Sequence, residues 1–417
     1  MRLPVAAGGG VPPDWLVVPG LAVFHLAMGF LRGPVLTSDG FRDAAYARAL
    51  VDAGFHIGRF LEQAQAMGST THPMFKVFYL AYIHLLALLQ SAFGEGWADA
   101  LIAINAAAQT LTAYLVLSLA WRATRSLAVW VTALAFLVAL ADFHQWVAMT
   151  QSDAIFVTMA TAVFALATRA AAAGRSARRL WIAAAAIAAV GAVSRPTWPP
   201  VLGMAVSAAL LAGALAEGPL AALRRWRLLM LLLLGAAAIA IPLSAALHFD
   251  PSVMPFAGAR DILLRWRPYF EGGVAVISRP ETYLGPRDSF LEFATVPIAR
   301  LAYFFWFTAD GFDSAHGLAN IAGHAPLYVL AMIGTFTAVR GSVHGLALAI
   351  GLIATIWIAM TAAFHAVTIL DFDWRYRAPV YPALILLAGL GVAYLERRLR
   401  ECRGSPAHGP GDAAAPR

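Results

Sequence analysis

The sequence predicts an all-α polytopic membrane protein of about ten transmembrane helices plus interfacial helices, and three observations support this. The 417 residues are 60% hydrophobic and only 13% charged, with a mean hydropathy of +0.70. Long apolar stretches recur along the whole chain, which a soluble protein of this size does not show. Arginines gather in the short loops between these stretches, as in the cytoplasmic loops of membrane proteins. We expect one transmembrane domain over residues 1–401, followed by a disordered cytoplasmic tail over residues 402–417.

Twelve apolar segments are candidate helices. In order they lie at 15–31, 74–93, 97–120, 127–141, 153–169, 180–194, 198–216, 228–247, 294–309, 324–339, 343–365 and 378–395. No small-residue cleavage site follows the first segment, so we expect a retained first span rather than a signal peptide.

The distribution of arginine decides which of these segments cross. Loop arginines should be cytoplasmic; they are Arg122, Arg125, Arg169, Arg175, Arg178, Arg179, Arg224, Arg225, Arg227, Arg340, Arg397, Arg398, Arg400 and Arg403. All of them fall on one side only if 74–93 and 294–309 lie in the membrane interface instead of crossing. Lys76 in the first of these segments and Arg300 in the second suit that location. Ten spans then remain, with both chain ends in the cytoplasm.

Two long segments are then predicted to lie outside the membrane, 32–96 and 248–323. Residues 41–65 of the first read as one amphipathic helix on the membrane surface, because apolar and charged side chains alternate at helical spacing. Membrane lipid is therefore an expected partner.

Composition excludes several classes of site. Cys402 is the only cysteine, which excludes a disulfide framework and a cysteine metal site. The formal charge of +7 comes from short loops between helices and needs no nucleic-acid partner. Nucleotide-binding, zinc-protease and Ser-His-Asp signatures do not stand out in the sequence.

Carboxylates mark the predicted outer ends of two spans. Asp39 and Asp43 follow the first span, where a carboxylate can act as the general base for an acceptor hydroxyl or amine. Asp153 begins the span 153–169, and an acid entering an apolar layer needs a partner. The alternative for all three is structural, since Ser or Asp before a helix caps its N-terminus and interacts with its dipole.

Isolated basic residues occur on the same predicted side. Arg195 precedes the proline-rich stretch 196–200, and Arg375-Tyr376-Arg377 opens the last span. Guanidinium groups match phosphate oxygens and stay charged when desolvated, which predicts phosphate binding. Snorkelling to the interface, or pairing with neighbouring acids, is the alternative. His72-Pro73 ends the first outer segment, either as a helix-starting turn or as a contact to the site.

In this order, these motifs resemble the GT-C superfamily of membrane glycosyltransferases, in the branch of protein O-mannosyltransferases and lipid A aminoarabinose transferases. The matching positions are Asp39 or Asp43 with Tyr46 and Gly54, then His72-Pro73, Asp153, Arg195, and the stretch 375–382. The family often has Asp-Glu at its first motif, whereas Gly40 follows Asp39 here. Which of the two aspartates would be the base therefore stays open.

The resemblance implies inverting transfer of a sugar from a polyprenyl-phosphate donor, at the outer face of a bacterial inner membrane. The acceptor would be a glycan, a lipid or a protein. Asp39 or Asp43 would be the base, and Arg195, Arg375 and Arg377 would stabilise the phosphate leaving group. Asp153 would orient the acceptor or hold a basic partner. Some relatives use a divalent metal, for which this sequence offers no firm ligand set.

Three other classes compete with this interpretation. A polysaccharide polymerase or ligase would use a diphosphate-linked glycan instead of a monophosphate-linked sugar. A transporter of lipid-linked glycans would have inverted repeats and helices broken in mid-membrane. A non-catalytic membrane scaffold would tolerate neutral substitutions at Asp39, Asp43 and Arg195.

Overall fold

The computed structural model describes residues 14–67, 79–195, 197–217, 298–308, 313–367 and 374–404. Within these residues the secondary structure is helical, apart from one isolated parallel bridge between Val35 and Met149. The predicted all-α class is confirmed for this part of the chain.

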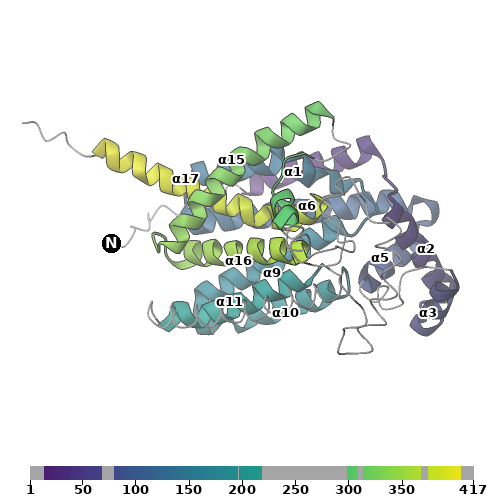
Figure 1. The fold of residues 1–417 in the computed structure, drawn as a ribbon. Helices are drawn as coiled ribbons and strands as arrows, with labels where there is room; N and C mark the ends of the chain where they lie inside the picture. Colours follow the sequence, from purple (N-terminus) through teal and green to yellow (C-terminus); the bar gives the residue numbers. More distant parts are fainter. Residues whose placement is uncertain are drawn as a thin grey trace, which may run out of the picture.

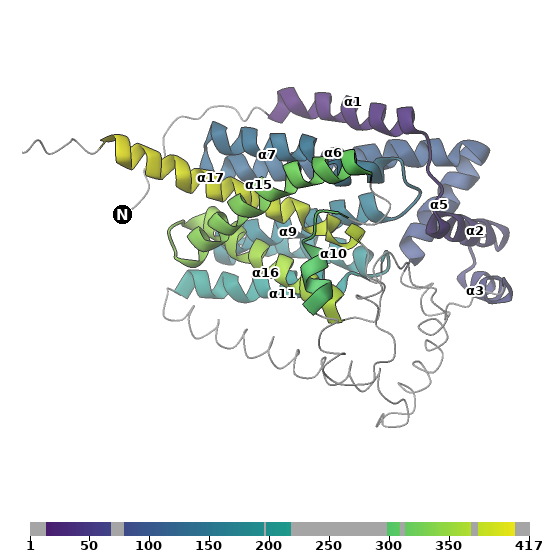
Figure 2. The same cartoon turned by 45° about the horizontal axis from the view of Figure 1, so that its top comes forward.

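The described residues include helices at nine of the ten predicted spans. They are α1 (Asp14–Arg32), α6 (Trp97–Thr124), α7 (Leu127–Ala139), α9 (Asp153–Ala173), α10 (Arg178–Ala192), α11 (Pro199–Glu217), α15 (Ser314–Val339), α16 (Gly345–Val367) and α17 (Tyr381–Gly404). Helices α9, α11, α16 and α17 lie side by side in the bundle, with α1, α6 and α7 along another side (Figures 1 and 2). The segment 228–247 lies outside the described residues.

Among the described residues, fewer helices than the predicted spans are both long and apolar enough to cross a membrane. Five apolar helical stretches of the described chain are long enough to cross a membrane, or six if a bent helix pair counts as one span. The apolar parts of α1 and α11, Val17–Arg32 and Pro199–Ala212, are shorter than a full crossing. The structure supports a membrane protein, whereas the count of about ten spans is not confirmed.

Loops gather at two opposite ends of the helix bundle. At one end, which we call the arginine end, Ser126 donates a hydrogen bond to Glu396 (2.8 Å) and Arg397 donates to the carbonyl of Ser342 (3.2 Å). Arg122 lies in the last turn of α6 there, and Arg340 is the C-cap of α15. The other end, the site end, carries Asp39, Asp43, Asp153 and Arg195. Arg122, Arg340 and Arg397 therefore lie at the end of the bundle opposite to these four polar residues.

Two segments expected in the interface are too short to cross in the described residues. Helix α5 (Leu80–Phe93) has 14 residues, or about 21 Å at 1.5 Å per residue, and packs on α2 and α6. The helix at 298–304 is shorter still. Both fall below the hydrocarbon thickness of about 30 Å.

The single surface helix expected over 41–65 is wrong. Two helices occupy this region, α2 (Ser38–Asp52) and α3 (Ile57–Ala66). Gly54 (φ +61°) and Phe55 (φ +62°) both adopt the left-handed conformation, which ends α2 with a bond from the Phe55 N–H to the Leu50 carbonyl. The side chains expected on one apolar face also differ in burial. Leu50 and Phe60 are buried in a core shared with α5, whereas Phe41 and Phe55 are exposed.

Helix α7 breaks at Leu140 and continues as α8 (Ala141–His144) and η2 (Gln145–Val147), bent by 69°. Side chains of α6 satisfy carbonyls freed by the break: Gln109 donates to Phe143 (2.8 Å) and Asn105 to Met149 (3.1 Å). This break turns the chain across the site end and brings residues 149–153 against the start of α2.

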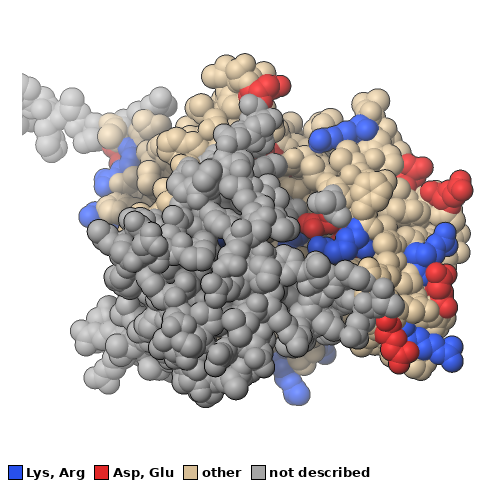
Figure 3. Space-filling view, turned by 45° about the vertical axis from the view of Figure 1, so that its right-hand side comes forward, with Lys and Arg blue, Asp and Glu red and all other residues tan. Residues whose placement is uncertain are grey.

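On the face shown in Figure 3, red and blue side chains lie along the right-hand side and at the left edge, with a further red and blue group near the centre. The last helix, α17, continues to Gly404, three residues into the segment predicted as a tail. Residues 405–417 lie outside the described chain.

Candidate functional site

The start of α2 forms an acidic cluster around Arg42. Its guanidinium contacts Asp39 at 3.0 Å and Asp43 at 3.0 Å. The N-cap is Thr37, whose hydroxyl accepts a hydrogen bond from the Gly40 N–H at 3.0 Å. Neither aspartate is the N-cap, although Asp39 lies in the first turn of α2, where a carboxylate interacts favourably with the helix dipole.

The two aspartates differ in environment. The Asp39 side chain is 31% exposed, whereas that of Asp43 is 3% exposed. Burial raises the pKa of Asp43 to about 6, against the opposing effect of the Arg42 cation. Arg195 also lies within electrostatic reach of Asp43, so the cluster borders the second half of the site. A carboxyl group with a pKa near neutrality is suited to accept a proton.

Asp153 and Arg195 form a buried ion pair that joins α9 to the turn after α10. The Asp153 carboxylate lies 2.6 Å from Nη1 of Arg195, and both side chains are at most 7% exposed. Arg195 Nη1 also donates to the Ser152 hydroxyl at 3.4 Å, and its guanidinium lies over the Phe156 ring at 5.5 Å. Ser152 is the N-cap residue of α9 without a side-chain capping bond, so Asp153 acts chiefly as the partner of Arg195.

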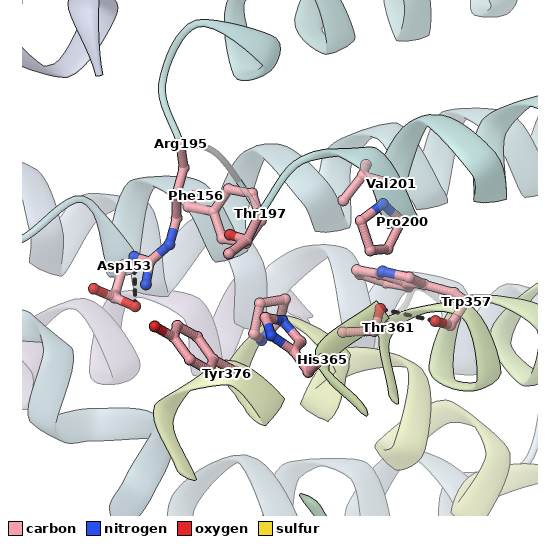
Figure 4. Close-up of a pocket in the computed structure, with 11 residues that line it drawn as sticks. Asp153, Phe156, Arg195, Thr197, Pro200, Val201, Trp357, Thr361, His365 and Tyr376 are labelled. Carbon is pink, nitrogen blue, oxygen red and sulfur yellow. Dashed lines mark hydrogen bonds and ion pairs between the residues drawn. The ribbon is translucent and has the colours of Figure 1, made fainter. Parts of the chain in front are cut away.

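A cavity opens beside this ion pair, with about 280 Å³ of empty space, part of it open to the outside. Its walls come from α9, the turn between α10 and α11, the start of α11, α16 and η6 (Trp374–Val380). The residues are Asp153, Phe156, Arg195, Thr197, Pro200, Val201, Trp357, Thr361, His365, Tyr376 and Pro379. Figure 4 shows the Asp153–Arg195 pair at one end and Trp357 at the other, with the Tyr376 hydroxyl pointing towards the pair. The cavity is thus charged at one end, and its other walls combine aromatic rings with Thr, Pro and Val side chains.

His365 is a wall residue that the motif analysis missed. It lies near the end of α16 and stacks on Tyr376, with ring centroids 4.4 Å apart and planes 5° apart. Its side chain is buried, and its Nδ1 has no hydrogen-bond partner among the residues that the structure describes. Arg300, also buried, donates to the His365 backbone carbonyl at 3.3 Å. A histidine inside an apolar span was the available signal, since such ionisable residues tend to be functional.

Arg377 lies apart from the cavity, although Tyr376 beside it lines the wall. Arg377 is 1% exposed and pairs with Asp142 of α8 at 3.0 Å. It also donates to the Tyr381 hydroxyl at 2.7 Å and to the Trp306 carbonyl. The structure therefore brings Tyr376 to Arg195 and Asp153, and gives Arg377 a separate carboxylate partner.

Hydrogen bonds from neighbouring side chains surround the Asp142–Arg377 pair. Asp142 accepts from the Tyr381 hydroxyl at 3.2 Å and lies 3.3 Å from Nε2 of His316. His324 uses both ring nitrogens, one with the Asn320 carbonyl (2.9 Å) and one with the Tyr381 hydroxyl (3.0 Å). None of these side chains lines the cavity.

Tyr82 is a further residue that the sequence did not single out. It is buried in α5, and within the described part of the chain its hydroxyl has no hydrogen-bond partner. The charges of Asp43, Asp153 and Arg195 all act on it, so it lies within electrostatic reach of both the acidic cluster and the ion pair. A tyrosine in an apolar segment looks like an ordinary core residue, so no sequence signal distinguished it.

Two predicted residues cannot be placed. His72 lies outside the described residues, as does the Arg375 side chain. Among the described residues, no three His, Cys, Asp or Glu side chains converge to hold a metal ion.

No family model, curated protein or solved structure matches this chain. A function has to be argued from the geometry of the site and from its sequence motifs.

Proposed function

We propose that this protein is an integral-membrane glycosyltransferase that transfers a sugar from a polyprenyl-phosphate donor to an acceptor at the site end of the bundle. The observation that carries this proposal is the combination of two unlike polar groups. Asp43 is a buried carboxyl with a pKa raised to about 6, and Arg195 is a buried cation held by Asp153 beside an aromatic cavity. A base and a leaving-group cation are the two parts that inverting glycosyl transfer needs.

The reaction exchanges one bond at the anomeric carbon of the donor sugar. An acceptor hydroxyl or amine forms the new bond while the bond from that carbon to the phosphate oxygen breaks. The acceptor proton passes to Asp43, and the electron pair leaves with polyprenyl phosphate. Negative charge therefore grows on the phosphate in the transition state, where a fixed cation lowers the barrier most.

Arg195 is suited to the leaving group because its orientation is fixed before the donor binds. Asp153 holds Nη1 at 2.6 Å, and Phe156 packs against the guanidinium face. A guanidinium has five N–H donors in a planar fork, so one group can serve a carboxylate and phosphate oxygens together. Because Arg195 is buried in a region of low dielectric constant, its attraction for negative charge on the phosphate is stronger than it would be in water.

Asp43 suits the base better than Asp39. Asp43 is buried and lies in the field of Arg195, whereas Asp39 is partly exposed and contacts Arg42 from the outer side. Asp39 raises the pKa of Asp43 by its negative charge, after burial as the larger cause. We assign proton transfer to Asp43, and we assign to Asp39 the adjustment of the pKa of Asp43.

The broken helix α7–η2 is the one feature that favours a transporter, because broken helices often form transport sites. Asn105 and Gln109 of α6 satisfy backbone carbonyls at this break. The broken segment also supplies Asp142, which is bonded to Arg377. These contacts give the break a structural explanation, so the transferase remains the better account.

The test follows loss of radiolabelled sugar from polyprenyl phosphate by purified protein in lipid nanodiscs. We expect the wild type to consume at least one donor, Asp43→Asn to lose about 10²- to 10⁴-fold in rate, and Asp39→Asn to lose much less. Asp52→Asn is the matched control, because Asp52 is an exposed carboxylate in the same helix. Consumption of no donor in a panel of polyprenyl-phosphate hexoses and pentoses, or full activity in Asp43→Asn, would overturn the proposal.

A further inference from the structure

Two hydrogen bonds of the acidic cluster end on the same oxygen of the proposed base. Nε and Nη2 of Arg42 donate to Oδ1 of Asp43, at 3.1 Å and 3.0 Å. The remaining nitrogen of the guanidinium, Nη1, lies 3.0 Å from the Asp39 carboxylate. Oδ2 of Asp43 receives no hydrogen bond from the residues that the structure describes. Arg42 therefore fixes the Asp43 carboxylate by one oxygen and leaves the other oxygen for a different partner.

The first turn of α5 holds Arg42 in turn. The guanidinium lies over the Tyr79 ring, 5.4 Å from its centroid. The start of α5 is attached to α10, because the Ala81 N–H donates to the Val193 carbonyl at 2.9 Å. Near the other end of α5, Gln90 donates to a backbone carbonyl of α2 at 3.0 Å. Helix α5 thus fixes the face of the guanidinium, while the two carboxylates of α2 fix its edge.

We propose that Arg42 is a positioning residue of the transferase, which holds Asp43 by Oδ1 so that Oδ2 takes the proton of the acceptor. The inference rests on the proposed function, in which Asp43 is the general base. A base works only within hydrogen-bond reach of the proton that it removes, and a misplacement of about 1 Å can cost about 10²-fold in rate. A carboxylate held by one oxygen keeps the other oxygen in a constant direction, whereas a carboxylate without Arg42 can turn about its last side-chain bond.

Arg42 also acts on the ionisation of Asp43. Burial raises the pKa of Asp43 to about 6, and the adjacent Arg42 cation opposes this rise. The other charged or titratable groups that interact with Asp43 are Asp39 on α2, Tyr79 and Tyr82 at the start of α5, and Arg195. If Arg42 is removed, the pKa of Asp43 should rise further, so that more of this carboxyl is protonated at neutral pH and cannot act as a base.

The experiment measures the pH dependence of kcat/KM for loss of labelled sugar from polyprenyl phosphate in nanodiscs. The acid limb of the wild type should lie near pH 6, the pKa of Asp43. In Arg42→Gln the limb should move up by about one pH unit, at the low end of the effect of one adjacent opposite charge. Arg42→Lys keeps the charge and loses the planar fork. Its limb should therefore stay near that of the wild type, while the rate on the plateau falls about tenfold or more.

Arg48→Gln is the matched control. Arg48 is exposed in the same helix and forms no ion pair with the described residues, so the substitution changes the net charge as Arg42→Gln does. Both the limb and the plateau of Arg48→Gln should match the wild type. Unfolding measured in parallel shows whether each variant is folded.

A second measurement needs no substrate. The free energy of unfolding is compared across pH for the wild type, Arg42→Gln, Asp43→Asn and the double variant. A carboxyl group whose pKa is raised on folding contributes stability at low pH, and this stability is lost as the pH rises through the folded-state pKa. In Arg42→Gln the loss should continue to higher pH than in the wild type. In the Asp43→Asn background, Arg42→Gln should leave the pH dependence unchanged.

The outcomes separate this inference from the proposed function. If the wild type consumes a donor and Arg42→Gln keeps the wild-type limb, the positioning role is overturned and the transferase stands. Equal losses of rate in Arg42→Gln and Arg42→Lys at every pH, with no shift of either limb, would show that Arg42 only supports the fold. If the wild type consumes no donor, the proposed function falls. The unfolding curves then decide whether Arg42 keeps Asp43 ionised, and the same pH dependence in wild type and Arg42→Gln overturns that as well.

Discussion

Two buried Asp–Arg pairs lie at the site end of this protein, and their surroundings differ. The open pair, Asp153 with Arg195, borders a cavity that has unbonded polar atoms in its walls. The closed pair, Asp142 with Arg377, is surrounded by Tyr381, His316 and the Trp306 carbonyl.

The difference shows that an ion pair of one residue type can serve two purposes. In the closed pair the hydrogen bonds on both partners come from the protein, as a buried pair needs if it is to hold elements together. In the open pair the adjacent space is left for another molecule. Removal of the cation should therefore cost stability at the closed pair and activity at the open pair.

The largest effect is expected at the closed pair. Arg377→Ala should lower the free energy of unfolding by about 3–5 kcal/mol, because it leaves the Asp142 carboxylate buried without its cation. The measurement is chemical denaturation in mixed micelles, followed by far-UV circular dichroism. Arg340→Ala is a control at the arginine end, where the guanidinium lies over the Phe336 ring of the same helix and contacts no carboxylate that the structure records. A loss below 1 kcal/mol for Arg377→Ala would contradict a structural role.

The contrast between the pairs also shows what the sequence could predict. Hydropathy and loop arginines were enough to place Asp39, Asp43, Asp153 and Arg195 at one end, because each lies next to a helix terminus. Sequence spacing could not show that Arg377 pairs with Asp142, 235 positions earlier in the chain. The motif therefore grouped Arg377 with Arg195 as a phosphate ligand, whereas the structure separates them.

At other positions the sequence contained a local indication of the structure, but a stronger pattern nearby indicated something else. Gly54 was noticed as part of a motif, yet the helical spacing of 41–65 hid the break that it allows between α2 and α3. His365 is the last residue of the apolar segment 343–365 and Asp142 directly follows the segment 127–141, and a rule for ionisable residues at membrane helices would have selected them.

The second prediction concerns the open pair. Arg195→Ala should reduce kcat about 10²- to 10³-fold, the effect of removing one group that stabilises charge in a transition state. Arg195→Lys keeps the charge and loses the planar fork, so it should recover part of the activity. Both are measured by release of labelled sugar under saturating donor. Activity in Arg195→Ala equal to wild type would show that the open pair is structural too.

The third prediction uses the pH dependence of kcat/KM, which reports groups in the free enzyme. Asp43 must be deprotonated to accept a proton, so activity should fall as the pH drops through about 6, the pKa to which burial raises this group. Asp39→Asn removes a negative charge that raises this pKa, and the acid limb should move to lower pH. Glu62→Gln, an exposed carboxylate in α3, is the control. If the acid limb of Asp39→Asn stays at the same pH as in the wild type, Asp43 is not the group whose titration sets that limb.

The smallest effect is expected where the acidic cluster is attached to the open pair. The Thr37 hydroxyl caps α2 and also accepts a hydrogen bond from Gln151, two residues before Asp153, at 2.6 Å. Thr37→Ala should cost about 0.5–2 kcal/mol of stability, the usual effect of losing an N-cap, and Thr37→Ser should restore it. Since the same hydroxyl fixes α2 against residues 150–153, Thr37→Ala should also lower kcat. A substitution in α17 that costs the same stability should leave kcat unchanged. A drop in stability with kcat unchanged would mean that Asp43 and Arg195 keep their positions without this link.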